Sequence, residues 1–227
     1  MRRFNLISML VALMTCALSA QNVNNDVKPM KQKLVVFVYD ISQSTESFGT
    51  LTEQHLTKIF DHLAFNGGGT FVAIRIQSNS SNQDVVCIDV PRVDTLSLSG
   101  NIYQRSTRLG INRKTKESLA SVRKEFVQKT KACLMIPKTE CKTDLWKALE
   151  LGMNSLKLSV YSHFEKHLII VSDLKDNVSK NRNAVMSFPS DVSVIAVRPD
   201  PQALTRLKGD TIMVSNTIEE AIKSITY

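Results

Sequence analysis

Oxygen-bearing side chains stand at the points where this sequence predicts its first buried strand and a later one to end. An apolar run at residues 34–39 is followed by Asp40-Ile41-Ser42-Gln43-Ser44, a D-x-S-x-S spacing. Carboxylate and hydroxyl oxygens are hard donors, which suit Mg²⁺ or Mn²⁺ and suit a soft metal poorly. Asp173 follows the later apolar run, and Thr143 opens the helical segment that precedes that run. The candidate metal ligands are therefore Asp40, Ser42, Ser44, Thr143 and Asp173.

These residues can meet only if the strands that carry them lie side by side in a mostly parallel sheet. Apolar, β-branched runs predict six strands, at residues 34–39, 70–76, 85–90, 167–173, 192–197 and 211–214. Apolar residues at helical spacing predict helices around residues 56–63, 119–126, 143–156, 201–207 and 218–225. A short Ser/Asn turn at residues 78–82 joins the second and third strands, so we expect the third to be antiparallel and at an edge. Residues 91–112 show no such period, and we expect a surface loop there.

The order and content of three segments resemble a known family. The first strand with D-x-S-x-S, the segment Thr143-Asp144-Leu145-Trp146-Lys147-Ala148-Leu149 and the run Leu168-Ile169-Ile170-Val171-Ser172-Asp173 look like the three parts of the metal-ion-dependent adhesion site (MIDAS) of von Willebrand factor A (vWA) domains. The resemblance covers residues 33–226. It implies an α/β, doubly wound, Rossmann-like fold: a mostly parallel six-stranded sheet with one antiparallel edge strand and helices on both faces.

The resemblance also implies a role for each candidate ligand. Ser42 and Ser44 would bind Mg²⁺ or Mn²⁺ directly, and Thr143 would bind it directly or through water. Asp40 and Asp173 would act mostly through waters and by orienting the hydroxyls. In this family a carboxylate from a partner protein commonly fills the open coordination position, which fits a cation with only two carboxylates nearby.

Some features depart from the family pattern or have simpler explanations. Leu174 follows the last aspartate where the family usually has glycine, and Lys142 precedes Thr143 where a small residue is usual. Asp176 is either an extra carboxylate or, as we expect, a solvated loop residue. Either serine of the D-x-S-x-S segment could instead cap the first helix, and Thr143 could cap the helix that it opens.

The amino terminus has the pattern of an export signal. Arg2 and Arg3 precede a largely apolar stretch, residues 6–18, and the small residues Ser19-Ala20 precede a polar switch. We expect residues 1–20 to be a signal peptide, residues 21–32 a polar linker and residues 33–227 the domain. A lipid anchor on Cys16 is the alternative. The protein should be exported, to the periplasm, cell surface or medium of a bacterium, with no transmembrane segment in the mature chain.

The cysteines and histidines outside the candidate site have structural explanations. In an oxidising compartment Cys133 and Cys141 are the natural disulfide pair, because they are close in sequence and flank a proline-containing loop. Cys87 lies in an apolar run, so we expect it to be buried. We expect His163 and His167 to be an exposed, unliganded pair at a helix-to-strand junction.

The basic residues are unevenly placed. Removing Arg2 and Arg3 lowers the net charge of +8 by two, to a moderate +6, which does not by itself argue for nucleic acid. Residues 105–131 are nevertheless rich in lysine and arginine, and include Lys116, Arg123 and Lys124. They form either a solvated helix face or a landing surface for an acidic partner. The stretch has little aromatic interleaving, so no nucleic-acid partner is expected.

The sequence therefore predicts an exported, non-catalytic binding module that uses a divalent cation to engage a partner protein. One alternative is a Mg²⁺-dependent phosphohydrolase with Asp40 as nucleophile, although such enzymes need a second aspartate where this chain has Ser42. Another is a metal-free scaffold that binds an acidic partner through the basic helix.

Overall fold

The structure is a computed structural model, which describes residues 30–43, 45, 49–83, 85–93, 96, 98–137, 142–178 and 184–225. Two compact units divide the chain, Met1–Met30 and Lys31–Tyr227, and the description below concerns the second. The predicted signal peptide and Cys16 lie outside the described residues, so they stay predictions. Within the described part of the chain, no helix combines the length and the apolar character needed to cross a bilayer.

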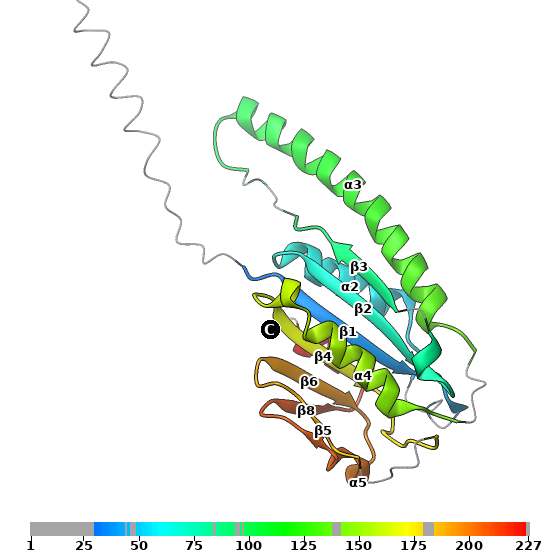
Figure 1. Cartoon of the computed structure of the whole chain (residues 1–227). Coiled ribbons are helices and arrows are strands. Elements are labelled where there is room, and N and C mark those ends of the chain that lie inside the picture. Colours follow the sequence, from blue (N-terminus) through cyan, green and yellow to red (C-terminus); the bar gives the residue numbers. More distant parts are fainter. Residues whose placement is uncertain are drawn as a thin grey trace, which may run out of the picture. The chain divides into compact units, whose positions relative to one another are not determined.

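Six strands form the main sheet. They are β1 (Lys33–Asp40), β2 (Gly69–Ile76), β3 (Val86–Val90), β4 (Glu165–Val171), β6 (Val192–Val197) and β8 (Ile212–Ser215). Their order is β3-β2-β1-β4-β6-β8, and every pairing is parallel except that of β3 with β2 (Figure 1). The predicted sheet, including its antiparallel edge strand, is therefore confirmed. A separate parallel pair, β5 (Met186–Ser187) with β7 (Leu207–Lys208), is not foreseen by the sequence patterns.

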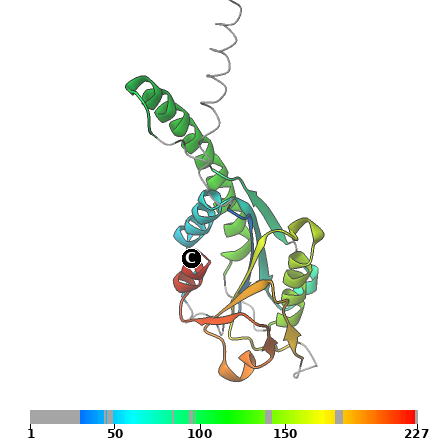
Figure 2. The same ribbon diagram turned by 90° about the vertical axis from the view of Figure 1, so that its left-hand side faces the viewer.

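Helices cover both faces of this sheet. They are α2 (Glu53–Phe65), α3 (Ile102–Leu134), α4 (Leu145–Leu156), α5 (Pro201–Leu204) and α6 (Ile218–Ser224), with short 3₁₀ turns η2 (Ser80–Asn82) and η3 (Ser159–Tyr161). In Figure 2, α2 in blue-green and α6 in red lie on one side of the sheet, and α4 in yellow-green lies on the other. The doubly wound arrangement is thus confirmed by the structure itself.

The core explains why β1 reads as an uninterrupted apolar run. Alternate side chains of a strand point to opposite faces, and both faces of β1 are covered. Val35, Phe37 and Tyr39 pack in one cluster with residues of α2, α3 and α6. Leu34, Val36 and Val38 pack in a second cluster with α4. Each fully buried side chain of this size contributes about 1.5–3 kcal/mol, so the carboxyl end of β1 is firmly positioned.

Helix α3 shows that the prediction of a surface loop over residues 91–112 is wrong for residues 102–112. The helix begins at Ile102, because Asn101 and Gln104 form a reciprocal capping box. The Asn101 side chain accepts from the Gln104 amide at 2.9 Å, and the Gln104 side chain accepts from the Asn101 amide at 3.1 Å. Two backbone donors at the helix start are satisfied in this way. The apolar period is absent here because the first buried residue of α3 is Leu119.

Two further predictions are wrong for reasons of strand position. Cys87 is exposed, because β3 is an edge strand and alternate residues of it face outward. His167 is buried, because β4 already begins at Glu165 and places His167 inside the sheet. Cys133 is buried as well, with its Sγ 3.9 Å from the carbonyl oxygen of Ala73. Cys141 lies outside the described residues, so the Cys133–Cys141 disulfide stays a prediction.

Candidate functional site

The candidate ligands on β1 and β4 lie at one edge of the sheet, at its topological switch point. The chain leaves β1 toward β2 on one side and later enters β4 on the other side. In open α/β sheets this reversal opens a crevice beyond the carboxyl ends of the strands. Asp40 is the last residue of β1, and Asp173 comes two residues after the end of β4.

Asp40 is a fully buried carboxylate with neutral hydrogen-bond donors. None of its surface is exposed. Its Oδ1 accepts from the backbone amide of Ser42 at 2.8 Å, and its Oδ2 accepts from the Ser172 hydroxyl at 2.7 Å. Burial raises the pKa of Asp40, hydrogen bonds from Ser42 and Ser172 oppose that shift, and the charge of Asp173 adds to it. Burial therefore disfavours the charged form of Asp40, and the neutral donors compensate for this only in part.

Basic side chains do not neutralise this charge within the described residues. No lysine or arginine there is among the groups that shift the pKa of Asp40. Two basic residues of the neighbouring loops have partners elsewhere: the Lys175 ammonium lies 3.3 Å from Asp200, and Arg206 donates to the carbonyl of Leu174 at 2.9 Å. Buried charges in proteins are normally paired or coordinate a metal. A cation at this edge would supply the missing partner.

Hydrogen bonds from the Thr45 hydroxyl stabilise the turn that contains Ser42. Thr45, which the sequence argument does not single out, directs its hydroxyl to the carbonyl oxygens of Asp40 at 3.1 Å and Ser42 at 2.9 Å. Ser42 is buried, and its side chain also hydrogen-bonds to Asp40. It does not cap α2, whose cap is Thr52. Ser44 lies outside the described residues, so its place in the site stays a prediction.

Thr143 is fastened to the loop that follows β4. Its hydroxyl donates to the carbonyl of Lys175 at 2.8 Å, and its own carbonyl accepts from the amide of Asn177 at 3.0 Å. It does not occupy the N-cap position of α4, which is Asp144. Two hydrogen bonds thus join the segment before α4 to the loop that carries Asp173.

The turn after Asp173 keeps a shape that glycine would favour. Leu174 has φ +63°, in the left-handed region that side chains other than glycine rarely adopt. Its side chain is buried in the α4-side core, and Arg206 holds its carbonyl. Asp173 accepts from the amide of Lys175 at 3.0 Å, two residues on. Leu174 therefore adopts a left-handed turn at the position where the sequence resemblance implies glycine.

The structure also places three further residues around the site, Ser172, Asp176 and Lys142. Ser172 links β4 to Asp40, and the signal was its hydroxyl directly before Asp173 at a strand end. Asp176 is half-buried rather than solvated, and it accepts from the amide of Trp146 at 3.2 Å, at the start of α4. Lys142 is exposed.

The predicted basic surface divides into bound and exposed residues. Arg123 lies 2.8 Å from Asp61 and its guanidinium stands over the Phe60 ring, so it covers the domain core. Lys116 and Lys124 are exposed.

Among the described residues, no three His, Cys, Asp or Glu side chains gather as a metal cluster. A cation site at this edge would therefore rest on hydroxyls as much as on carboxylates.

Comparisons with known proteins give only loose likenesses. No protein family model matches the chain, and no curated protein matches it. Among solved structures, proximal thread matrix protein 1 from the mussel byssus is 13% identical with a TM-score of 0.45, over 86% of this chain and 46% of its own. A von Willebrand factor type A structure from Catenulispora acidiphila is 13% identical with a TM-score of 0.40, over 86% and 41%. The SpRpn10 VWA domain is 8% identical with a TM-score of 0.38, over 85% and 95%.

The chain spans less than half the length of the first two of these structures. Because the sequence identities and TM-scores are this low, the fold class rests on the sheet order and on the helices of this chain itself.

Proposed function

We propose that this protein is an exported, vWA-like binding module that holds Mg²⁺ or Mn²⁺ at the carboxyl edge of its sheet and engages a partner protein there. The observation that carries the proposal is the buried Asp40 carboxylate, which has neutral donors and no basic partner among the described residues. Ser42, Ser44, Thr143 and Asp173 would complete the set of oxygen donors.

The hydroxyls fit this role because their hydrogens are already donated. Thr143 gives its hydrogen to Lys175, and the side chain of Ser42 hydrogen-bonds to Asp40. A hydroxyl whose hydrogen is donated presents oxygen rather than hydrogen to a further partner, and a hard cation binds such oxygens. A bound cation would supply a positive charge that attracts a further anionic oxygen. Because the site offers few carboxylates of its own, a carboxylate of the partner protein is the expected additional ligand.

Binding is favoured over catalysis by the burial of Asp40. A nucleophilic aspartate must reach its substrate, whereas the Asp40 side chain has no exposed surface and both of its oxygens accept hydrogen bonds. A phosphohydrolase of the type considered above also needs an acid at position 42, where this chain has serine. Hydrolysis of a generic phosphate ester that is lost in Asp40→Asn would support the enzyme instead.

A thermal-melt titration tests the cation site. The purified protein is titrated with Mg²⁺, Mn²⁺ and Ca²⁺ beside the double variant Asp40→Ala/Ser42→Ala. A cation that binds only the folded state raises the melting temperature. We expect Mg²⁺ or Mn²⁺ to stabilise the wild type and not the variant. Equal shifts in both proteins would place the cation elsewhere.

Partner binding needs a second, differential experiment. The protein is immobilised and exposed to the extracellular fraction of its source in Mg²⁺ or in excess chelator, with the same double variant as control. We expect at least one partner to be retained only by the wild type in Mg²⁺. Partners that bind equally well in chelator would contradict the proposed function.

A further inference from the structure

The first half of α3 stands away from the domain. No residue from Ile102 to Ser118 is buried, and the packing of α3 on the core begins at Leu119. At a rise of about 1.5 Å per residue, this half projects for about 25 Å, as the upper part of α3 in Figure 1 shows. We call this half of α3, together with Leu96 and residues 98–101 of the preceding segment, the arm.

Hydrogen bonds fix the two parts of the arm to each other. Asn112 accepts from the amide of Leu96 at 3.0 Å and donates to the carbonyl of Leu96 at 3.0 Å. Nearer the tip, Arg108 donates to the hydroxyl of Ser99 at 3.0 Å. The preceding segment is therefore strapped along the helix at two points, which gives the arm a defined surface.

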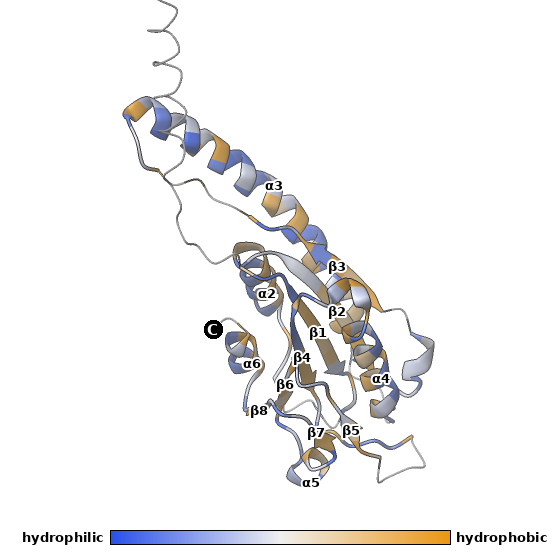
Figure 3. Ribbon diagram, turned by 60° about the vertical axis from the view of Figure 1, so that its left-hand side comes forward, coloured by the Kyte–Doolittle hydropathy of each residue, from blue (hydrophilic) through white to orange (hydrophobic). Residues whose placement is uncertain are grey.

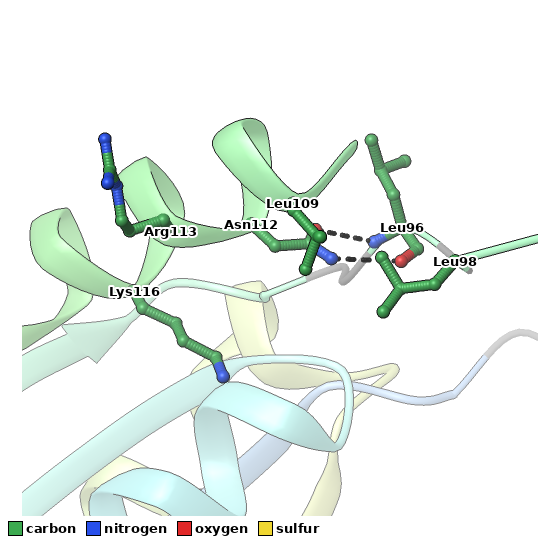
Figure 4. Close-up of a pocket in the computed structure, with 6 residues that line it drawn as sticks. All are labelled: Leu96, Leu98, Leu109, Asn112, Arg113 and Lys116. Atoms are coloured by element: carbon green, nitrogen blue, oxygen red, sulfur yellow. Dashed lines mark hydrogen bonds between the residues drawn. The ribbon is translucent and has the colours of Figure 1, made fainter. Parts of the chain in front are cut away.

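A groove of about 490 Å³ runs between the preceding segment of the arm and the helix. Figure 4 shows the side chains of Leu98 and Leu109 directed toward each other and that of Leu96 directed away from them, with Arg113 and Lys116 following along the helix. The three leucines are 42%, 46% and 54% exposed. The groove thus has an apolar floor and two cationic groups at one end.

Charge and apolar surface are both concentrated on the arm. It carries five basic residues against the single acid Glu117, and the basic residues are Arg105, Arg108, Arg113, Lys114 and Lys116. Six of its large apolar side chains are exposed: Leu96, Leu98, Ile102, Tyr103, Leu109 and Ile111. Figure 3 shows this mixture as orange and blue bands along the upper half of α3. The three leucines that line the groove gather part of this apolar surface in one place, and an exposed apolar patch rimmed by polar groups marks an interaction site.

We propose that the groove of the arm binds an acidic segment of a partner protein, with an apolar side chain seated against the leucines that line the groove and carboxylates on Arg113 and Lys116. Arginine pairs with carboxylates through two parallel hydrogen bonds, which gives such a contact direction as well as charge. This surface lies on the arm and does not depend on the cation site.

Two other occupants fit the arm less well. A second copy of the chain would bring two arms of the same positive charge together, which charge repulsion disfavours. A membrane would favour one continuous apolar stripe. At about 100° per residue, however, Ile111 lies on the opposite side of the helix from Ile102 and Leu109.

Fluorescence anisotropy with defined peptides tests this proposal. The probe is a labelled, glutamate-rich peptide with a central Leu-Phe pair, and its controls carry Ser-Ser in place of the pair or lysine in place of glutamate. We expect the probe to bind more tightly than either control. Its binding should weaken as salt is raised and should be the same in Mg²⁺ and in chelator. This last result separates the arm from the cation site, so either proposal can fail alone.

Variants locate the binding on the groove. Arg113→Glu/Lys116→Glu and Leu109→Ser should each weaken the probe by about tenfold or more, whereas Lys124→Glu, an exposed change on the same helix beyond the arm, should not. All the changed side chains except that of Leu109 are charged and exposed, and melts verify that each variant folds. No binding of the probe, or an equal loss in Lys124→Glu, overturns the proposal. Preferred binding to phosphatidylserine vesicles, or a self-association that Leu109→Ser abolishes, also overturns it.

Discussion

The substitution Asp40→Asn separates the demands of the fold from those of a cation. It removes the negative charge and keeps the shape of the side chain. Its amide oxygen can still accept a hydrogen bond from the backbone amide of Ser42. Its amide nitrogen can donate to the Ser172 hydroxyl, whereas in the wild type that hydroxyl donates to Asp40. Any change in stability then reports on the charge rather than on lost packing.

The expected effect has opposite signs with and without the cation. Without it, the wild type keeps a buried charge without a basic partner among the described residues, and burial is the main reason that the pKa of Asp40 is raised. Removing a buried charge that has no basic partner relieves its desolvation cost, so we expect the variant to be about 1–2 kcal/mol more stable in chelator. That corresponds to about 2–8 °C for a domain of this size. With Mg²⁺ at about 100 times its Kd, the wild type gains about 2.7 kcal/mol and the variant gains nothing.

Chemical denaturation in chelator and in Mg²⁺ measures both signs with the same samples. The matched control is Asp89→Asn, an exposed carboxylate that accepts from the Thr70 hydroxyl at 2.7 Å. This control should be close to neutral and should not alter the response to Mg²⁺. The reasoning is refuted if Asp40→Asn lowers the free energy of unfolding equally in both buffers, because the fold itself would then need the charge.

Three further predictions concern the surroundings of the site and the opposite end of the sheet. Leu174→Ala should lower the free energy of unfolding by about 2–4 kcal/mol, because it removes a buried side chain. Leu174→Gly should be about 1 kcal/mol more stable than the alanine variant, because glycine relieves the left-handed φ. The reverse order of stability in urea denaturation would contradict this. Ser172→Ala should lower the free energy of unfolding by about 1.5–3 kcal/mol in the wild type and by clearly less in the Asp40→Asn background. Equal losses in the two backgrounds of this double-mutant cycle would rule out a charge-assisted hydrogen bond. Burial and the Lys33 charge lower the pKa of His62 from 6.5 to about 4, so the folded state prefers the neutral ring. Stability should therefore fall as the pH drops from 6.5 toward 4, by about 1–2 kcal/mol after solvent screening, and a pH series on His62→Gln that shows the same slope would contradict this origin.

The strands and their order could be read from the sequence because each central strand is buried on both faces. Residues such as Val36 and Phe37 then form uninterrupted apolar runs, and the Ser/Asn turn after β2 indicates the antiparallel edge strand. The same reasoning failed for Cys87, because an edge strand exposes alternate residues that an apolar run alone does not distinguish.

The arm could not be read from apolar periodicity because it buries nothing. A local signal was present all the same: Asn101 and Gln104 stand at the spacing of a capping box, directly after Gly100. At the site, the strand-end aspartates Asp40 and Asp173 were found by position, whereas the bond from Ser172 to Asp40 joins residues that are distant in the chain and close only in the folded sheet.

The central claim is that a divalent cation binds beside Asp40, and crystals of the protein grown with Mn²⁺ test it most directly through anomalous scattering. The account predicts one Mn²⁺ peak at the carboxyl edge of the sheet, about 2.1 Å from the Ser42 hydroxyl oxygen, with Thr143 bound directly or through water. That peak should vanish in Asp40→Ala/Ser42→Ala. Fully formed crystals with no peak at this edge, or with a peak that survives the double substitution, would contradict the account.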